Sequence, residues 1–271
     1  MSHAAEKGSV ATAFTIIEER VSFLPVSSLQ MLKKPMIALW RTLSGSTMSG
    51  ADGGSTSMKD PLIARERMVE EQLKSRGIKD QRILAAFLEV PRHKFVEDYL
   101  KYKAYEDYPL SIGFGQTISQ PYMVAIMTES LRVRPSHRIL EIGSGSGYQA
   151  AILSRLCSVV YSIERVSALA SRARKTLDDL GYFNIHIRIG DGTMGLPQDG
   201  PYDGIIVTAG APHVPEALIE QLSPGGCLII PVGDQSLQDL KRITKSTEGA
   251  KEESLGGCRF VKLIGKNGWS D

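Results

Sequence analysis

The feature that most constrains this chain is an alternation of short apolar runs with helical segments that begins near residue 138. The runs predicted to be strands are RILEIG, VVYSIE, NIHIRIGD, YDGIIVT and CLIIPVG. Between them lie amphipathic segments such as YQAAILSRL and VSALASRARKTLDDLG. This rhythm is typical of parallel βαβ units. We therefore predict an α/β fold with a doubly wound, Rossmann-like sheet of about seven strands.

The segments on either side complete the predicted sheet and cover it. Two more strands are expected in LQDLKRITKS and CRFVKLIG, flanking a polar insert, TEGAKEESLGG. Ahead of the alternating region, helical patterns occupy residues 59–77 and 80–89, and a third helix is expected to start at Pro121. These segments predict a helical N-terminal cap on the sheet.

A change in composition marks a boundary near Met58. Residues 44–57 read SGSTMSGADGGSTS, a run of small and polar residues that is typical of a flexible linker. We predict a flexible or disordered extension and linker over residues 1–57 and a folded domain over residues 58–271. The sequence leaves open whether the extension is disordered, binds a partner weakly, or reflects a true start at Met58.

Charge and composition argue against several classes of partner. The chain has 32 basic and 30 acidic residues, a formal net charge of +2, which gives no indication of nucleic acid or an anionic membrane as a partner. No apolar run approaches the roughly 18 residues of a membrane-spanning helix. The three cysteines form no CxxC pair, so we expect neither disulfides nor a metal site. We expect a cytoplasmic monomer.

The loop after the first strand of the alternating region is glycine-rich. Gly143, Gly145 and Gly147 are spaced GxGxG, and Glu141 precedes them by two positions. A dinucleotide site has the spacing GxGxxG, and a carboxylate here would repel a pyrophosphate. It suits a ligand with a cationic amino group, such as the methionine end of S-adenosylmethionine. The alternative is a tight strand–helix turn without a ligand.

Acidic residues also follow the next two strands. Glu164 is placed to accept hydrogen bonds from ribose hydroxyls, and Asp191, ahead of Gly192, from an adenine amine. The alternatives are a solvated charge at a helix start for Glu164 and an Asx turn for Asp191. Because parallel strands end at the same edge of a sheet, we expect these acids and Glu141 to line one edge.

Several motifs carry a resemblance to a known family. ILEIGSGSGYQAAIL, VVYSIE and the later GDG resemble the motifs of class I S-adenosylmethionine-dependent methyltransferases. DYPLSIGFGQTISQPYMVA, PRHKFV and RFVKLIGKNGW are similar to segments of protein-L-isoaspartate O-methyltransferases, and the likeness covers residues 60–269 or so. The resemblance implies methyl transfer from S-adenosyl-L-methionine to the free carboxylate of isoaspartyl residues in damaged proteins and peptides. That reaction releases S-adenosyl-L-homocysteine and initiates repair.

The resemblance also implies site residues. Ser119 matches the assigned active-site serine of the family, and Gln116, Thr117 and Ile118 would lie beside the cofactor. A helix N-cap ahead of Pro121 is the alternative for Ser119. The sequence departs from the family after TIS, where no histidine follows. It departs again near the C-terminus, where FVKL stands in place of FVPL, which puts the peptide preference in doubt.

The chemistry needs little from the protein beyond alignment. A carboxylate with a pKa near 4 is ionised at neutral pH, so no general base is required, and we expect no catalytic role for His213.

Of three other possible functions, the sequence leaves two open and argues against one. A class I enzyme acting on a small molecule or RNA stays open, although the Asn/Asp-Pro-Pro-aromatic element of base methylation is missing after residue 207. A cofactor-binding module without turnover also stays open, whereas a dehydrogenase fails on the loop spacing.

Overall fold

The computed structural model describes residues 60–270. The helices are α3 (Pro61–Met68), α4 (Gln81–Glu89), α5 (Pro121–Ser130), α6 (Tyr148–Ser154), α7 (Ser167–Asp179) and α8 (Glu216–Glu220). The strands are β1 (Leu110–Gly113), β2 (Gln116–Ile118), β3 (Arg138–Ile142), β4 (Val159–Glu164), β5 (Ile185–Ile189), β6 (Tyr202–Val207), β7 (Leu222–Gly233), β8 (Gln238–Ser246) and β9 (Gly249–Cys258). The extension predicted over residues 1–57 lies outside the described residues, so it and its boundary stay predictions.

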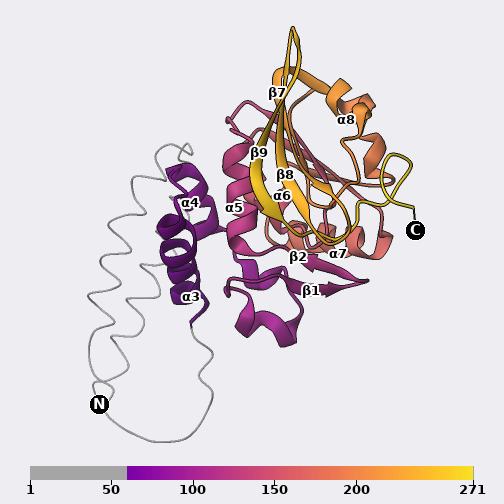
Figure 1. The fold of residues 1–271 in the computed structure, drawn as a ribbon. Helices are drawn as coiled ribbons and strands as arrows, with labels where there is room; N and C mark the ends of the chain where they lie inside the picture. The colour runs from indigo at the N-terminus through magenta and orange to yellow at the C-terminus, as the bar shows by residue number, and fades with distance from the viewer. Residues whose placement is uncertain (1–59, 271) are drawn as a thin grey trace, which may run out of the picture. The chain divides into compact units, whose positions relative to one another are not determined.

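A sheet forms the centre of the described domain (Figure 1). It has seven strands in the order β5-β4-β3-β6-β7-β8-β9. Neighbouring strands from β5 to β7 pair in parallel, while β8 and β9 are added as antiparallel strands. The chain runs outward from β3 to β5 and then returns to place β6 on the other side of β3. The doubly wound sheet is confirmed, and its topological switch point lies between β3 and β6.

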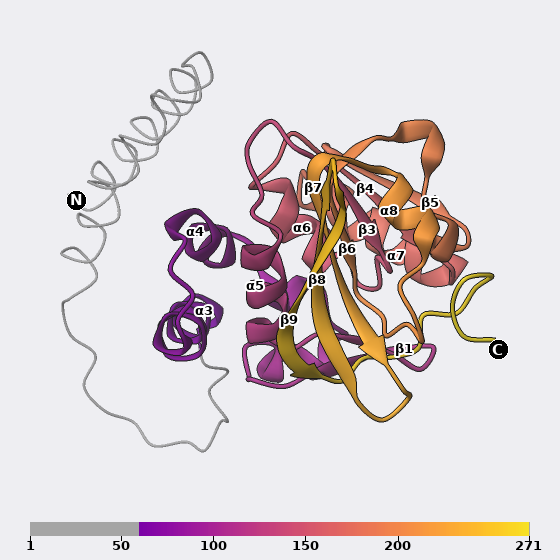
Figure 2. The same ribbon diagram turned by 45° about the horizontal axis from the view of Figure 1, so that its top comes forward.

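Alternate residues of the central strands form hydrophobic cores on the two faces of the sheet. Ile139, Ile206 and Ile229 pack on one face with residues of α4, α5, α6 and α7. Leu140 and Ile205 pack on the opposite face with α8 and the C-terminal segment. Figure 2 shows α5 and α6 on one side of the sheet and α8 on the other. Because both faces are covered, the central strands are mainly apolar and are easy to recognise in the sequence.

The predicted N-terminal helices are present. The Asp60 carboxylate accepts a hydrogen bond from the backbone N–H of Leu62 at 2.9 Å and caps α3. After α3 the helical path continues as a π-helical turn, η1 (Val69–Leu73), and a 3₁₀ turn, η2 (Lys74–Arg76). It ends at Gly77, whose φ of 95° is the left-handed conformation that closes helices.

The C-terminal part differs from the sequence prediction. The expected polar insert forms most of strand β9, and CRFVKLIG, expected to be a strand, makes only isolated bridges. Strand β9 lies at the edge of the sheet with almost every side chain exposed, so no apolar alternation marks it. The residues after it are apolar because Val261 and Leu263 pack into the core on the α8 face. Their backbone bonds go to Gly210, which donates to the Val261 carbonyl at 2.7 Å and accepts from the Leu263 N–H at 2.8 Å.

Residues 60–270 contain neither a membrane-spanning helix nor a cluster of metal-ligating side chains. No helix in this range is both long enough and apolar enough to cross a membrane. The same range holds no group of three or more His, Cys, Asp or Glu side chains suited to bind a metal ion.

Candidate active site

An open cleft with about 630 Å³ of empty space lies where β3, β4 and β6 end. This is the switch point of the sheet, where α/β folds bind ligands. The cleft is lined by Gln116, Thr117, Ile142, Gly143, Gly145, Ile163, Glu164, Arg165, Val166, Gly192, Thr208, Ala209, Val261, Lys262, Leu263 and Ile264.

The glycine-rich loop forms the floor of the cleft through Gly143 and Gly145. The three glycines have φ values of 98°, 51° and 86°, all in the left-handed region. A Cβ atom on Gly143 would lie 2.5 Å from the Thr208 hydroxyl oxygen. That hydroxyl donates to the Gly143 carbonyl at 2.8 Å and ties the loop to the end of β6. Gly147 is the N-cap of α6 and packs against Leu177, so it shapes the loop from below and does not line the cleft.

Glu164 lies on the cleft, at the end of β4, as the sequence predicts. One carboxylate oxygen accepts the Gly145 N–H at 2.8 Å, and the other accepts the Val166 N–H at 2.9 Å. The side chain is therefore held against the glycine loop by two backbone N–H groups. A carboxylate offers about four lone-pair positions, so each oxygen still has one with which to accept a hydroxyl donor from a ligand.

Glu141 does not line the cleft, and the contact of its carboxylate with a bound amino group stays a prediction. The residue has no exposed surface, and one carboxylate oxygen is hydrogen-bonded to the Ser162 hydroxyl on the neighbouring strand. The Ser162 hydroxyl lies 2.6 Å from that of Ser144 in the glycine loop. The other oxygen of Glu141 has no partner within the described residues. Burial raises the pKa of Glu141 to about 8, so it is mainly uncharged at neutral pH and supports the loop from below.

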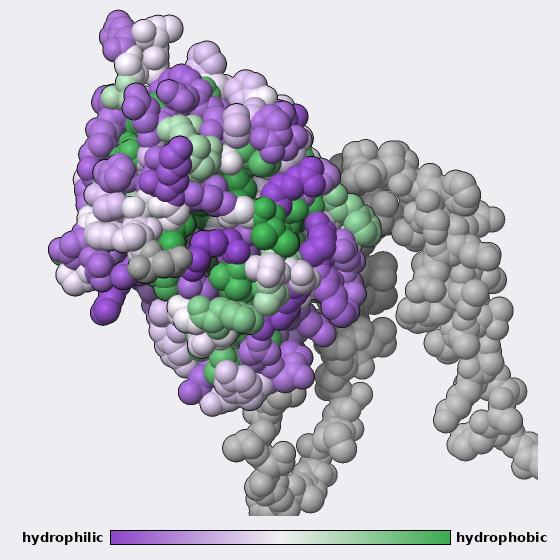
Figure 3. Space-filling view, turned by 90° about the vertical axis from the view of Figure 1, so that its right-hand side faces the viewer, coloured by the Kyte–Doolittle hydropathy of each residue, from purple (hydrophilic) through white to green (hydrophobic). Residues whose placement is uncertain are grey.

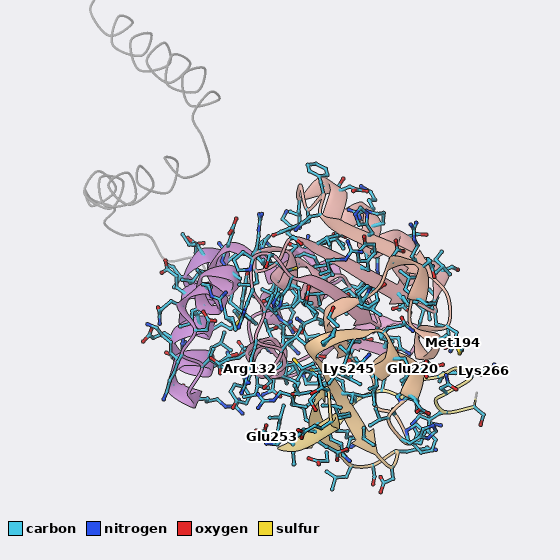
Figure 4. The ribbon with its side chains drawn as sticks, turned by 90° about the horizontal axis from the view of Figure 1, so that it is seen from above. Arg132, Met194, Glu220, Lys245, Glu253 and Lys266 are labelled. Carbon is cyan, nitrogen blue, oxygen red and sulfur yellow. The ribbon has the colours of Figure 1, made fainter. Side chains whose placement is uncertain are left out.

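Asp191 is also turned away from the cleft, although Gly192 lines it. One Asp191 oxygen accepts from the N–H and the hydroxyl of Thr193, and the other accepts the Lys266 N–H at 2.7 Å. Partial burial opposes its ionisation, but these bonds lower the pKa of Asp191 below its ordinary value. The contact of Asp191 with adenine stays a prediction. Asp191 makes the Asx turn that was its alternative and binds the C-terminal segment, where Figure 4 shows Lys266 beside Met194.

The TIS segment reaches the cleft through a hairpin that the sequence did not indicate. Strands β1 and β2 pair antiparallel, and Gln116 and Thr117 on β2 line the cleft. Ile118 is buried in the core, only 3% exposed, and is not on the cleft. Ser119 follows the last residue of β2, is partly exposed, and is not among the residues that line the cleft.

The hydroxyl of Ser119 has no hydrogen-bond partner among residues 60–270. Gln120 occupies the N-cap position of α5 and Pro121 starts the helix, with no side-chain capping bond. The helix-cap alternative for Ser119 is therefore wrong. Its carbonyl oxygen, by contrast, accepts a hydrogen bond from Arg92 at 2.7 Å. Ser119 thus has a fixed backbone and an available hydroxyl donor.

Sequence reasoning missed the residues that close the far side of the cleft. Thr208 and Ala209 follow β6, and the rule that strand ends form the site would have found them. Residues 261–264 have no such signal, because their place depends on bridges to Gly210. Figure 3 shows the face that lies on the right in Figure 1, and on this face hydrophobic patches are separated by hydrophilic ones.

Comparison with known proteins gives a consistent result. Residues 64–268 match the family described as Protein-L-isoaspartate(D-aspartate) O-methyltransferase. Protein-L-isoaspartate O-methyltransferase 2 of Geotalea uraniireducens is 58% identical over 210 residues, which is 77% of this chain and 96% of the relative.

Two solved structures are similar to this fold. One, a protein-L-isoaspartate O-methyltransferase, has a TM-score of 0.69 and 33% identity and covers 75% of this chain and 67% of its own. The other is a Plasmodium falciparum protein described as the same enzyme, in complex with S-adenosyl-L-homocysteine. It has a TM-score of 0.65 and 29% identity over 74% of this chain and 98% of its own.

Proposed function

Because this chain belongs to the protein-L-isoaspartate(D-aspartate) O-methyltransferase family, we propose that the cleft beside β3, β4 and β6 holds its cofactor and that Ser119 orients the carboxylate that accepts the methyl group. The activity of the chain is transfer of a methyl group from S-adenosyl-L-methionine to the free carboxylate of isoaspartyl residues. Its macromolecular substrates are damaged proteins and peptides, and the methyl ester that it forms initiates their repair.

The donor groups on the cleft fit S-adenosylmethionine. Glu164 has acceptor positions left for the two ribose hydroxyls, and Gly143 and Gly145 allow a ligand to approach the backbone closely. Gly192 is a second place without a side chain, because a Cβ there would collide with Ile142. Gln116 and Thr117 supply polar groups on the side of the β1–β2 hairpin. When bound, the cofactor supplies a methyl group that is already activated by its positively charged sulfur.

Ser119 has the properties that the acceptor side of this reaction requires. An isoaspartyl carboxylate is ionised at neutral pH and needs alignment, with reacting atoms about 3–3.5 Å apart. A neutral hydroxyl can hold one carboxylate oxygen while the other remains reactive, whereas a cation would hold the charge more strongly and reduce its nucleophilicity. The available Ser119 hydroxyl, next to a cleft-lining strand, is the observation that carries this proposal.

The acceptor peptide is proposed to lie along the wall formed by residues 261–264. Val261, Lys262 and Leu263 line the same cleft as Glu164 and Thr117. The family often has proline at the position of Lys262, so this chain places a cationic side chain and an additional backbone N–H there. We expect both to affect which flanking residues of the peptide are accepted.

Two variants separate the cofactor and acceptor roles. Ser119→Ala should reduce turnover and leave the affinity for S-adenosyl-L-homocysteine unchanged. Glu164→Ala should weaken that affinity by about 1–3 kcal/mol, because buried hydrogen bonds are lost. Isothermal calorimetry with S-adenosyl-L-homocysteine and initial rates on an isoaspartyl peptide measure both quantities. Ser171→Ala, an exposed serine on α7, is the control and should change neither. Equal loss of affinity in the Ser119 and Glu164 variants would contradict the division of roles.

A further inference from the structure

Arg92 is a fully buried arginine directly behind Ser119. It belongs to a 3₁₀ turn, η3 (Arg92–Lys94), and none of its surface is exposed. Its Nε atom donates to the Ala104 carbonyl and its Nη2 atom to the Ser119 carbonyl, each at 2.7 Å. Its guanidinium carbon lies 4.8 Å from the centre of the Tyr148 ring.

No carboxylate compensates for this buried charge. Arg92 makes no ion pair within the described residues, and its Nη1 atom has no hydrogen-bond partner there. Burial lowers the pKa of Arg92 to about 10. A buried charge without a counter-ion is unfavourable, and an apolar side chain of similar volume would fill the same space more stably. Packing alone therefore does not explain an arginine at this position.

The contacts of Arg92 connect the two halves of the proposed site. Ser119 follows β2 on the acceptor side. Tyr148 is the first residue of α6 and follows Gly147, the last glycine of the cofactor loop. Tyr148 is itself held by edge-on contacts with Phe87 and Phe95, at ring-centre distances of 6.1 and 5.5 Å. A guanidinium that bonds to the Ser119 carbonyl and stacks on Tyr148 therefore fixes the acceptor side of the site relative to the glycine loop on the cofactor side.

We propose that Arg92 is a positioning residue for methyl transfer, one that fixes Ser119 relative to the glycine loop. The inference rests on the role proposed for Ser119. A planar guanidinium reaches two separate carbonyl groups and stacks on a ring at once, which the single ammonium of a lysine cannot do. Loss of one contact lets Ser119 shift relative to the cofactor. A displacement of about 1 Å at a reacting centre costs on the order of 100-fold in rate.

Arg92→Lys tests this role because it keeps the charge and removes the two-carbonyl geometry. We expect kcat on an isoaspartyl peptide to fall by about 10- to 100-fold. The KM for S-adenosylmethionine and the affinity for S-adenosyl-L-homocysteine should stay within about twofold of the wild-type values. A residue that only stabilises the fold would not give this split between kcat and cofactor binding.

Arg174→Lys is the matched control. Arg174, on α7, also donates to two carbonyl groups, those of Ile185 at 2.6 Å and Tyr182 at 3.3 Å, and differs from Arg92 in its ion pair with Asp178 and its partial exposure. Its replacement should lower the melting temperature and leave kcat unchanged.

Three results would overturn the proposal. One is a folded Arg92→Lys variant with the wild-type kcat, while Ser119→Ala is impaired. Another is a loss of cofactor affinity in Arg92→Lys as large as its loss of kcat. If Arg92→Lys does not fold, the same comparison is made with Arg92→Gln, and failure of both to fold would make Arg92 a folding residue instead. If Ser119→Ala retains full activity, the role of Ser119 fails, and that outcome is separate from the result for Arg92.

Discussion

Replacement of Glu141 by glutamine should stabilise the protein at alkaline pH and change little near pH 5. The carboxyl group is fully buried below the glycine loop, and one of its oxygens accepts a hydrogen bond from the Ser162 hydroxyl. Burial raises its pKa from the ordinary value of 4.5 to about 8. Glutamine has nearly the same shape and no charge, so the variant tests the charge alone.

The direction in which stability changes with pH follows from the proton that the Glu141 carboxyl group retains in the folded state. Below about pH 4.5 the carboxyl group is protonated in both states and contributes no pH dependence. Between about pH 4.5 and pH 8 the unfolded state loses the proton and the folded state keeps it, so stability falls as the pH rises. Above about pH 8 both states are ionised, and the loss is complete.

The gain in the free energy of unfolding expected for Glu141→Gln has an upper bound and a smaller expected value. The difference between about 8 and 4.5 corresponds to about 5 kcal/mol at about 1.36 kcal/mol per pH unit. Structural relaxation and water penetration lower the effective cost of a buried charge, so we expect about 2–4 kcal/mol. At an m-value of about 2–3 kcal/mol/M for urea, this is a shift of about 1 M in the unfolding midpoint.

Urea unfolding of Glu141→Gln and wild type at several pH values between about 5 and 9 measures this difference. The difference in free energy of unfolding should grow with pH and become constant above about pH 8. Glu66→Gln, an exposed glutamate on α3, is the control and should show no such growth. A difference for Glu141→Gln that does not vary with pH, or that grows toward acid, would refute the reasoning.

Two further predictions concern the residues that shape the cleft. Gly143→Ala combines a φ of 98° with a Cβ 2.5 Å from the Thr208 hydroxyl oxygen and should lower the free energy of unfolding by about 2–4 kcal/mol, measured by urea unfolding. Gly225 also has a positive φ, but a Cβ there would lie in open space, so Gly225→Ala should lower the free energy of unfolding by less. Equal effects of the two substitutions would contradict the collision with Thr208. Asp191→Asn should speed hydrogen exchange at the Lys266 amide near neutral pH. Because bonds to its charged form lower the pKa of Asp191, this difference should vanish as the pH falls well below 3.8, and its persistence there would count against the account.

The sheet was predictable because its central strands are buried on both faces. Strands β3, β4, β6 and β7 are apolar runs ended by glycine or polar residues, and this pattern identifies them. Strand β9 has no buried face, so local composition resembles that of a loop. The β1–β2 hairpin was missed because its turn places Gly113, Phe114 and Gly115 all at positive φ, and a phenylalanine gives no signal for that conformation.

The site was predictable in its location and only partly in its contacts. Chain order and the switch-point rule place Glu164 and two of the loop glycines on the cleft, as observed. The contacts of Glu141 and Asp191 depend on partners elsewhere, Ser162 on the adjacent strand and Lys266 in the C-terminal segment. Local sequence does not identify such partners.

Several expectations stay predictions. These are the monomeric state, the absence of a nucleic-acid partner and the cytoplasmic location. Sedimentation of the full chain would test the first of these.

The most direct test of the central claim is methyl transfer from labelled S-adenosylmethionine to a short isoaspartyl peptide, with its normal aspartyl twin as the control. We expect a base-labile methyl ester in the isoaspartyl peptide and none in the twin, with the rate reduced by Ser119→Ala. Equal labelling of both peptides, or no labelling while S-adenosyl-L-homocysteine still binds, would contradict the claim that this cleft methylates isoaspartyl carboxylates.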